Sequence, residues 1–341
     1  MTTNNRFQTF IISRTDSIGD VVLTLPLAAV LKKEFPGCHI LFLGNAYTKE
    51  VIRCCANVDR FLDWDQISRL SPEQQVTDIK ATGADVIIHA FPRAAIARLA
   101  KSAGIQLRIG ASGRLYHWNT CNRIVWLSRR RSQLHETQLN LKLLDGLMPH
   151  HKFTLQEIPE LYGFNSIVPL PPQIEQLLKP DKFNLILHPR SKGSAREWGL
   201  HNFNQLVELL PQDKFRIFIT GTADEGRAAF AENGLKRSNR IIDLTGKQNL
   251  GELITFIQHA DGLIAASTGP LHLAAALNKV AIGIYPPMRP IHPARWGPLS
   301  KKAFYFVKPG TCSKCRNGGS CECMSSIDPA KVAQRILTLV T

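Results

Sequence analysis

Short apolar segments alternate with longer amphipathic segments along this chain, and the alternation occurs twice. The short segments are rich in β-branched and aromatic residues, as buried strands are, and the longer ones have helical periodicity. This alternation predicts parallel sheets covered by helices, because parallel neighbours must be joined by crossovers. The first expected strands are Phe7–Ser13, His39–Leu43, Asp85–Ala90, Leu107–Gly110 and Arg123–Leu127. The second set is Phe183–His188, Phe215–Thr220, Arg240–Leu244, Asp261–Ala266, Val280–Tyr285 and Ala303–Val307.

The segment 158–180 separates the two sets. It contains five prolines and no sustained periodicity, a composition typical of a linker. We therefore expect two doubly wound, Rossmann-like α/β domains, residues 1–168 and 169–327, with a ligand in a central cleft where the carboxyl ends of both sheets face each other. Residues 328–341 are expected to form a helix that crosses back onto the first domain.

The charge balance restricts the partners of the chain. Its 341 residues include 42 Lys and Arg against 27 Asp and Glu, which gives a net charge of +15. Such a surface favours nucleic acid, an acidic membrane face or phosphorylated substrates. No segment reaches the roughly 18 to 20 apolar residues that span a bilayer, and the N-terminus lacks a signal-peptide pattern. We expect a cytoplasmic protein, with peripheral attachment to the inner membrane left open.

The eight cysteines fall into two groups. Four are scattered through segments with core character, namely Cys38, Cys54, Cys55 and Cys121. The other four, Cys312, Cys315, Cys321 and Cys323, form a C-x2-C-x5-C-x-C pattern. The single residue between the last two is tighter than the spacing of structural zinc sites. A reduced structural loop is therefore the favoured interpretation, and a zinc site is the alternative.

The first strand-to-helix junction presents a carboxylate. Residues 12–26 contain one glycine, Gly19, whereas a dinucleotide-binding unit needs three in a G-x-G-x-x-G spacing. This disfavours nicotinamide chemistry and leaves Asp20 at the mouth of the sheet. Asp20 is either a functional carboxylate or the cap of the next helix. Pro26 fits the first turn of a helix better than its interior.

Residues 187–198 suit phosphate binding at a second junction. They follow an expected strand and include Ser191, Lys192, Gly193 and Arg196. Backbone amides, a hydroxyl and two cations in one loop can hold a diphosphate. The alternative is a solvated basic loop.

Residues 265–277 form a third junction with the same potential. Ser267 and Thr268 are natural N-caps, and Pro270 is a favoured first-turn residue. The amides at such a helix start would face a phosphate. His272 either points toward this ligand or is a satisfied core histidine.

Together these three motifs resemble glycosyltransferase family 9, the lipopolysaccharide heptosyltransferases. The family pattern has an S-x-x-G-D loop followed by a Pro, an H-P-x-S-x(4)-K/R-x-W loop, and a D/S-[ST]-G-x-x-H-L-A-A-A-L helix. This chain supplies Ser17–Asp20 with Pro26, His188–Trp198 and Ser267–Leu277 in the same order, although Ser17 and Gly19 are separated by one residue rather than two. His135-Glu136 with Asn140 is a weaker match to the helix that ends the family's first domain.

The resemblance implies a GT-B fold and an inverting glycosyltransferase. The reaction would move heptose from ADP-heptose onto a lipopolysaccharide core acceptor, either lipid A-Kdo or heptose. By matching position, Asp20 would be the catalytic base that takes the proton of the acceptor hydroxyl. The first domain would bind the acceptor and the second the nucleotide-sugar. No cofactor is required by this chemistry, and a divalent cation stays open.

The family pattern also assigns binding residues. The donor would be bound by Ser191, Lys192, Arg196, Glu225, Gln248, Ser267, Thr268, Gly269 and His272. Asp224 is an alternative to Glu225, and Ser267 replaces an Asp of some members, which leaves the donor sugar open. The acceptor, an anionic glycolipid at the inner membrane face, would be bound by Arg14, Ser17, Gly19 and Arg93.

Two other functions compete with glycosyl transfer. The first is a sugar-nucleotide epimerase or hydrolase of the same fold. The second is a basic nucleic-acid-binding protein whose cysteine loop is a zinc module. The net charge supports the second, but the chain has no interleaved aromatic and basic pattern of an RNA platform. We therefore do not expect nucleic acid as a partner.

Overall fold

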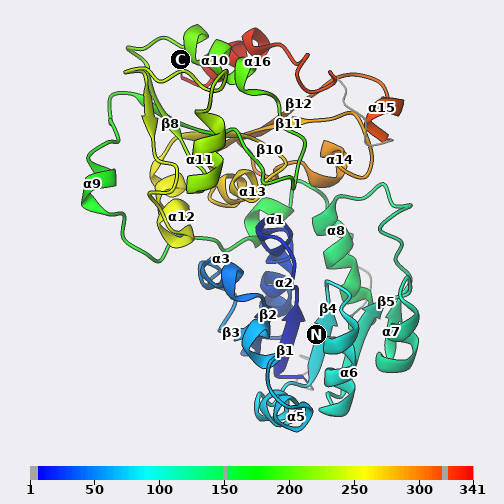
Figure 1. The fold of residues 1–341 in the computed structure, drawn as a ribbon. Coiled ribbons are helices and arrows are strands. Elements are labelled where there is room, and N and C mark those ends of the chain that lie inside the picture. Colours follow the sequence, from blue (N-terminus) through cyan, green and yellow to red (C-terminus); the bar gives the residue numbers. More distant parts are fainter. Residues whose placement is uncertain (1–6, 149–151, 317–321, 341) are drawn as a thin grey trace. The chain divides into compact units, whose positions relative to one another are not determined.

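The computed structural model describes residues 7–148, 152–316 and 322–340. The chain divides into two compact units, Met1–Asn165 and Ser166–Thr341. Each unit contains a six-stranded sheet whose neighbouring strands are parallel (Figure 1). Helices connect the strands, as the alternating sequence pattern predicts.

The sheet of the first unit has the strand order β3-β2-β1-β4-β5-β6. Its strands are β1 (Thr9–Ser13), β2 (His39–Gly44), β3 (Arg60–Asp63), β4 (Val86–His89), β5 (Leu107–Ala111) and β6 (Arg123–Val125). Its helical segments are α1 (Ile18–Val22), α2 (Pro26–Glu34), η1 (Ala46–Thr48), α3 (Lys49–Arg53), α4 (Trp64–Ile67), α5 (Pro72–Ala81), α6 (Ala94–Ser102), α7 (Leu115–Thr120), α8 (Glu136–Leu141), η2 (Lys142–Gly146) and η3 (Ile158–Leu161). Pro26 begins α2, which confirms its predicted first-turn position.

The central strands of this sheet are buried on both faces. Phe10, Ile11 and Ile12 are fully buried, and so are the equivalent apolar residues of β4. Continuous apolar runs are expected where helices cover both sides of a parallel sheet. The sequence did not predict β3, an edge strand in which Leu62 is the single buried residue.

The sheet of the second unit has the order β12-β11-β10-β7-β8-β9. Its strands are β7 (Phe183–His188), β8 (Phe215–Ile219), β9 (Ile241–Asp243), β10 (Gly262–Ala266), β11 (Val280–Tyr285) and β12 (Ala303–Val307). Its helices are α9 (Pro172–Glu175), α10 (Leu200–Leu209), α11 (Ala223–Ala229), α12 (Leu250–His259), α13 (Gly269–Ala276), α14 (Pro293–Trp296), α15 (Ser313–Arg316) and α16 (Pro329–Leu337).

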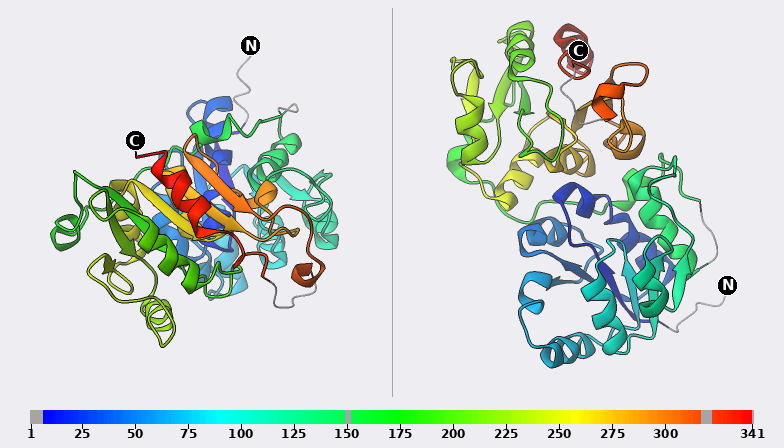
Figure 2. Two further views of the ribbon diagram at one scale, coloured as in Figure 1. Left: turned by 90° about the horizontal axis from the view of Figure 1, so that it is seen from above. Right: turned by 45° about the vertical axis from the view of Figure 1, so that its right-hand side comes forward.

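The C-terminal helix α16 belongs to the second unit. Val332, Ala333 and Ile336 are buried in one core cluster with Trp198 and Phe203. The helix packs against α10, and Figure 2 (left) shows it in red beside the yellow and orange strands of the same sheet. The expectation that residues 328–341 cross back onto the first domain is therefore wrong. The apolar stripe of α16 is instead buried within its own unit.

Both sheets have the order in which the first strand lies beside the fourth. This is the doubly wound arrangement, and the sequence prediction of two such α/β sheets is confirmed. The topological switch points lie between β1 and β4 and between β7 and β10. Ligands of such folds bind outside the carboxyl ends of the strands at these points.

Two further sequence expectations concern buried thiols and membrane spans. Cys38, Cys54, Cys55 and Cys121 are buried, which confirms their predicted core positions. No helix in the part of the chain that the structure describes is long and apolar enough to cross a membrane.

Candidate active site

Asp20 lies in the first turn of α1, immediately after the central strand β1. Ser17 is the N-cap of this helix, with an extended backbone and a hydroxyl that accepts the backbone N–H of Asp20 at 3.5 Å. The interpretation of Asp20 as the cap is therefore wrong. The Ser17 hydroxyl also donates to the Asp20 carboxylate, so Ser17 orients this side chain.

The Asp20 carboxylate is ion-paired with Arg14. Arg14 follows β1 directly and is only 3% exposed. Its Nε donates to Asp16 Oδ1 at 2.6 Å, and its Nη1 lies 3.5 Å from Glu136 Oε1. Sequence reasoning assigned Arg14 to the acceptor, but the structure directs its guanidinium toward these three carboxylates.

The carboxylates determine the protonation of this cluster. Burial alone would lower the pKa of Arg14, but Asp20, Asp16 and Glu136 outweigh it and raise the pKa above its ordinary value. Burial raises the pKa of Asp16 to about 6, against the opposing effect of Arg14. The Arg14 guanidinium is therefore positively charged at every physiological pH. It is the ion-pair partner of Asp20.

Four residues of this cluster were not predicted as site residues, namely Asp16, Glu136, Arg129 and Asn140. Glu136, the first residue of α8, is buried and also pairs with Arg129. Asn140 accepts hydrogen bonds from Arg14 at 3.3 Å and from Arg129 at 2.9 Å. The signal in the sequence that pointed to Glu136 and Asn140 was their weak match to the helix that ends the family's first domain. This match did not show which residues Glu136 would contact.

The other acceptor candidates lie close to the same loop. Gly19 is a buried residue of α1. Arg93 follows β4 on the other side of the switch point, and its Nη2 donates to the Thr15 carbonyl at 3.4 Å. Its guanidinium carbon lies 6.0 Å from the Trp64 ring. The structure thus brings Arg14, Ser17, Asp20 and Arg93 together at one switch point.

The donor candidates follow four neighbouring strands of the second sheet. Residues 189–199 follow β7, Thr268 follows β10, Glu225 follows β8 and Gln248 follows β9. These strands are adjacent in the order β10-β7-β8-β9. Their carboxyl ends therefore present all the predicted donor residues along one edge of the sheet.

The loop after β7 is held by its own hydrogen bonds. Ser191 Oγ donates to the Ala195 carbonyl at 2.8 Å, and the Ser191 amide donates to Glu197 at 3.0 Å. Lys192 and Gly193 have φ values of +47° and +79° and form the centre of a tight turn. Ser191 thus shapes the loop, and the turn leaves Lys192 exposed.

The imidazole of His188, at the end of β7, is structural. It shares a 3.0 Å hydrogen bond with Thr220 Oγ1. Burial lowers the pKa of His188 to about 4, although nearby Glu225 acts in the opposite direction. The ring is therefore neutral at physiological pH.

The start of α13 contains an unsatisfied buried hydroxyl. Thr268 is the N-cap, yet its side chain makes no capping bond, and its Oγ1 has no hydrogen-bond partner within the described residues. Gly269 begins the helix, and His272 is buried in its first turn. Burial raises the pKa of the neighbouring Tyr285, and Ser267 acts in the opposite direction. Because buried polar atoms are normally paired, Thr268 Oγ1 indicates a site for an additional ligand or water.

Gln248 shows the same feature in the loop before α12. Both polar atoms of its side-chain amide are buried without a hydrogen-bond partner among residues whose positions are described. Glu225 instead forms a capping box with Thr222, whose amide donates to Glu225 Oε2 at 2.8 Å. Asp224 pairs with Arg227 on the surface. Gln248 and Thr268 are thus two predicted donor residues whose buried polar atoms lack a partner among the described residues.

The late cysteine loop lies in the same unit. Cys312, Cys315 and Cys323 bring their sulfur atoms within 4.8 Å of one another. Cys321, the fourth candidate zinc ligand, lies outside the described residues.

Comparisons with known proteins agree with this geometry. The model of glycosyltransferase family 9 (heptosyltransferase) matches residues 80–324. A putative glycosyltransferase of Haemophilus influenzae is 27% identical over 303 residues, which cover 85% of this chain and 86% of that protein. Lipooligosaccharide heptosyltransferase 2 of the same organism is 28% identical over 159 residues, 43% of this chain and 45% of the relative.

Solved structures share the fold. A family 9 glycosyltransferase of Veillonella parvula has a TM-score of 0.80 at 18% identity and covers 98% of this chain and 97% of its own. The ADP-heptose heptosyltransferase II of Escherichia coli has a TM-score of 0.76 at 16% identity, with 98% of each chain covered. The predicted GT-B fold is confirmed by this likeness and by the two parallel sheets. The family model spans well over half of the chain, and the chain belongs to glycosyltransferase family 9, the heptosyltransferases.

Proposed function

We propose that this glycosyltransferase moves heptose from ADP-heptose onto a lipopolysaccharide core acceptor, lipid A-Kdo or heptose, with inversion at the anomeric carbon. The observation that carries the proposal is the Asp20 carboxylate at the β1/β4 switch point, oriented by Ser17 and paired with Arg14. Names of relatives support the sugar and the acceptor, since one is a lipooligosaccharide heptosyltransferase and a structural neighbour is an ADP-heptose heptosyltransferase.

In this reaction Asp20 acts as the general base. Its carboxylate takes the proton of the acceptor hydroxyl while the hydroxyl oxygen bonds to the anomeric carbon. The bond from that carbon to the diphosphate breaks at the same time, and ADP leaves with the electron pair. Arg14 and Ser17 hold the carboxylate in one orientation through an ion pair and a hydrogen bond.

The second unit would bind the nucleotide-sugar. Lys192 is an exposed cation in the turn after β7, and Thr268 and His272 lie at the positive end of the α13 dipole. These groups suit the diphosphate. The buried amide of Gln248 supplies a donor and an acceptor for the nucleoside. Residues 169–327 would thus form the donor domain, and residues 1–168 the acceptor domain.

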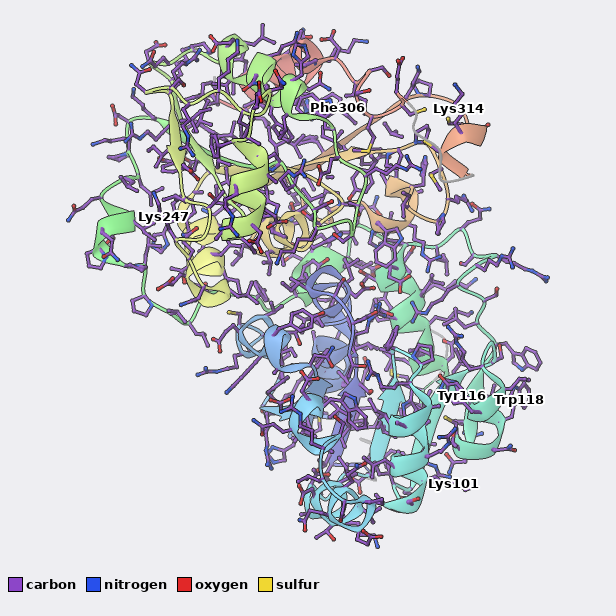
Figure 3. The ribbon with its side chains drawn as sticks, viewed as in Figure 1. Lys101, Tyr116, Trp118, Lys247, Phe306 and Lys314 are labelled. Carbon is purple, nitrogen blue, oxygen red and sulfur yellow. The ribbon has the colours of Figure 1, made fainter. Side chains whose placement is uncertain are left out.

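An exposed aromatic patch supports an acceptor at a membrane face. Leu115 is 89% exposed, Trp126 76% and Trp118 50%, and the two indole rings are 5.7 Å apart. Figure 3 labels Trp118 at α7. Arg114 and Arg123, which adjoin this patch in the chain, are also exposed. Tryptophan with arginine is the combination that enters the headgroup region of anionic bilayers.

Vesicle sedimentation tests the membrane part of the proposal. We expect the protein to sediment with vesicles that contain anionic phospholipid, and the double variant Trp118→Ser with Trp126→Ser to bind at least about tenfold more weakly. Tyr305→Ser, which removes an exposed aromatic residue of the second unit, is the matched control and should bind normally. Equal binding by all three proteins would contradict a membrane role for the patch.

Turnover assays test the reaction. The wild type should release ADP from ADP-heptose only with an acceptor, and the glycosidic product should have the inverted anomeric configuration. Asp20→Asn should lose transfer by about 10²-fold or more while ADP binding, measured by calorimetry, survives. Asp78→Asn, which replaces a partly exposed carboxylate on α5, is the control. Full activity of Asp20→Asn would exclude the base role, and sugar turnover without acceptor would favour an epimerase or hydrolase.

A further inference from the structure

The three described cysteines of the late loop have the geometry of a thiolate metal site. Their sulfur atoms lie within 4.8 Å of one another, and four-coordinate zinc with bonds of about 2.3 Å places its sulfur ligands roughly 3.8 Å apart. An adjustment of about 1 Å or less would therefore complete the arrangement. A disulfide needs sulfur atoms only about 2.05 Å apart, a larger rearrangement, and would leave the third cysteine unused.

The local backbone favours the thiolate form. Cys312 comes directly before α15, and the backbone amide of Cys315 donates to Cys312 Sγ at 3.4 Å. An N–H donated to sulfur stabilises the negative thiolate more than the neutral thiol. Lys314, labelled in Figure 3, adds a positive charge between the two cysteines of the same turn.

We propose that Cys312, Cys315 and Cys323 bind one zinc ion as thiolates. We further propose that this centre positions Arg196 in the loop after β7, residues 189–199, which we call the donor loop. The fourth coordination position is not assigned. Binding replaces the three thiol protons with the ion, and each proton is released to solvent. The zinc here is structural and takes no part in the transfer step. The positioning role rests on the proposed nucleotide-sugar function, whereas the zinc site does not.

Contacts between the two loops connect the centre to the donor site. Arg196 Nη2 donates to the carbonyl of Cys315, a ligand residue, at 3.2 Å. Trp198 Nε1 donates to the Ile327 carbonyl at 2.9 Å, and Asn202 Nδ2 donates to the Ser325 carbonyl at 2.8 Å. The loop after β7 and the first turn of α10 are thus fixed to the backbone on both sides of Cys323. Loss of the ion would free the Cys315 carbonyl to move and release the Arg196 guanidinium.

Metal analysis of the full-length protein tests the site. After purification under reducing conditions and dialysis against metal-free buffer, we expect about one zinc ion per chain. Cys312→Ser and Cys315→Ser should each lose most of it, whereas Cys38→Ser, which replaces a buried thiol of the first unit, should retain it. No stoichiometric zinc in the wild type, even after reconstitution with zinc chloride, would overturn the proposal, as would a disulfide within the cluster.

Calorimetry of ADP binding tests the positioning role. Removal of zinc with a chelator should weaken ADP binding by about tenfold, and zinc chloride should restore it. Arg196→Ala should bind ADP about as weakly with full zinc content, and removal of its zinc should have no further effect. Equal weakening of the wild type and Arg196→Ala by the chelator would overturn the positioning role. Failure of the zinc-loaded wild type to bind ADP would instead overturn the proposed donor. The zinc site would then be judged by the measured zinc content alone.

Discussion

The carboxylate cluster of the first unit has one more negative charge than positive charge. Arg14 and Arg129 face Asp16, Asp20 and Glu136. Asp16 is the group whose pKa burial raises to about 6, from an ordinary value of 3.8. Ionised Asp16 should therefore destabilise the native state, and Asp16→Asn should remove this cost while it keeps an oxygen for Arg14.

The size and the pH range of this effect follow from the two pKa values. The native state binds more protons than the unfolded state between about pH 4 and 6, so stability falls as the pH rises through this range. The difference of 6 − 3.8 = 2.2 corresponds to about 3 kcal/mol. Asp16→Asn should raise the free energy of unfolding by up to about 3 kcal/mol at about pH 8. At about pH 3 the carboxyl is protonated in both states, and the variant should gain little.

Urea unfolding followed by tryptophan fluorescence at a series of pH values measures this difference. Asp78→Asn removes a partly exposed carboxylate of the same unit, outside the cluster, and should show no comparable dependence on pH. A stability gain of the same size at every pH would refute a titration of Asp16 as its cause. A loss of stability at about pH 8 would refute the reasoning altogether, because it would show that attraction to Arg14 outweighs burial.

Three further substitutions probe other contacts. Arg14→Met leaves buried carboxylates without their shared guanidinium and should cost about 3–5 kcal/mol in urea unfolding at about pH 8. Trp198→Phe removes the indole donor of the Ile327 carbonyl and should cost about 1 kcal/mol, seen as a lower Tm. Gly226→Ala places a Cβ atom 2.0 Å from Thr245 Oγ1 and should cost about 1–3 kcal/mol, of which Thr245→Ala should recover part.

Strands were predictable from the sequence where burial is continuous. The central strands β1, β4, β7 and β10 each contain a run of at least three buried apolar residues, because helices cover both faces of their sheets. Edge position removes this signal. In β3, residues 60–63, a single side chain is buried, and neither an apolar run nor an alternation marks it as a strand. Its pairing with β2 depends on tertiary contacts that a short sequence window does not contain.

The site was predictable where the relevant residues are neighbours in sequence. Each donor motif is a strand, a loop and a helix start within about a dozen residues, so its position at the sheet edge follows from local pattern alone. The contact of Arg14 with Glu136 joins residues 122 positions apart and depends on how α8 packs against α2. Sequence reasoning therefore found Arg14 and assigned it to the acceptor, without the carboxylates that surround it.

This cluster changes what the net charge of +15 means for the acceptor. Arg14 and Arg129 are occupied by carboxylates, and Arg108 donates to the carbonyls of Ile105 and Thr120. A guanidinium already held by carboxylates and carbonyls would have to break these bonds to bind an acceptor phosphate, and a buried one would leave an unpaired carboxylate behind. Exposed arginines such as Arg114 and Arg123, which adjoin the tryptophan patch in the chain, could bind the proposed anionic glycolipid without this cost. Charge reversal at Arg114 should therefore weaken binding to anionic vesicles without loss of stability, whereas charge reversal at Arg129 should destabilise the fold.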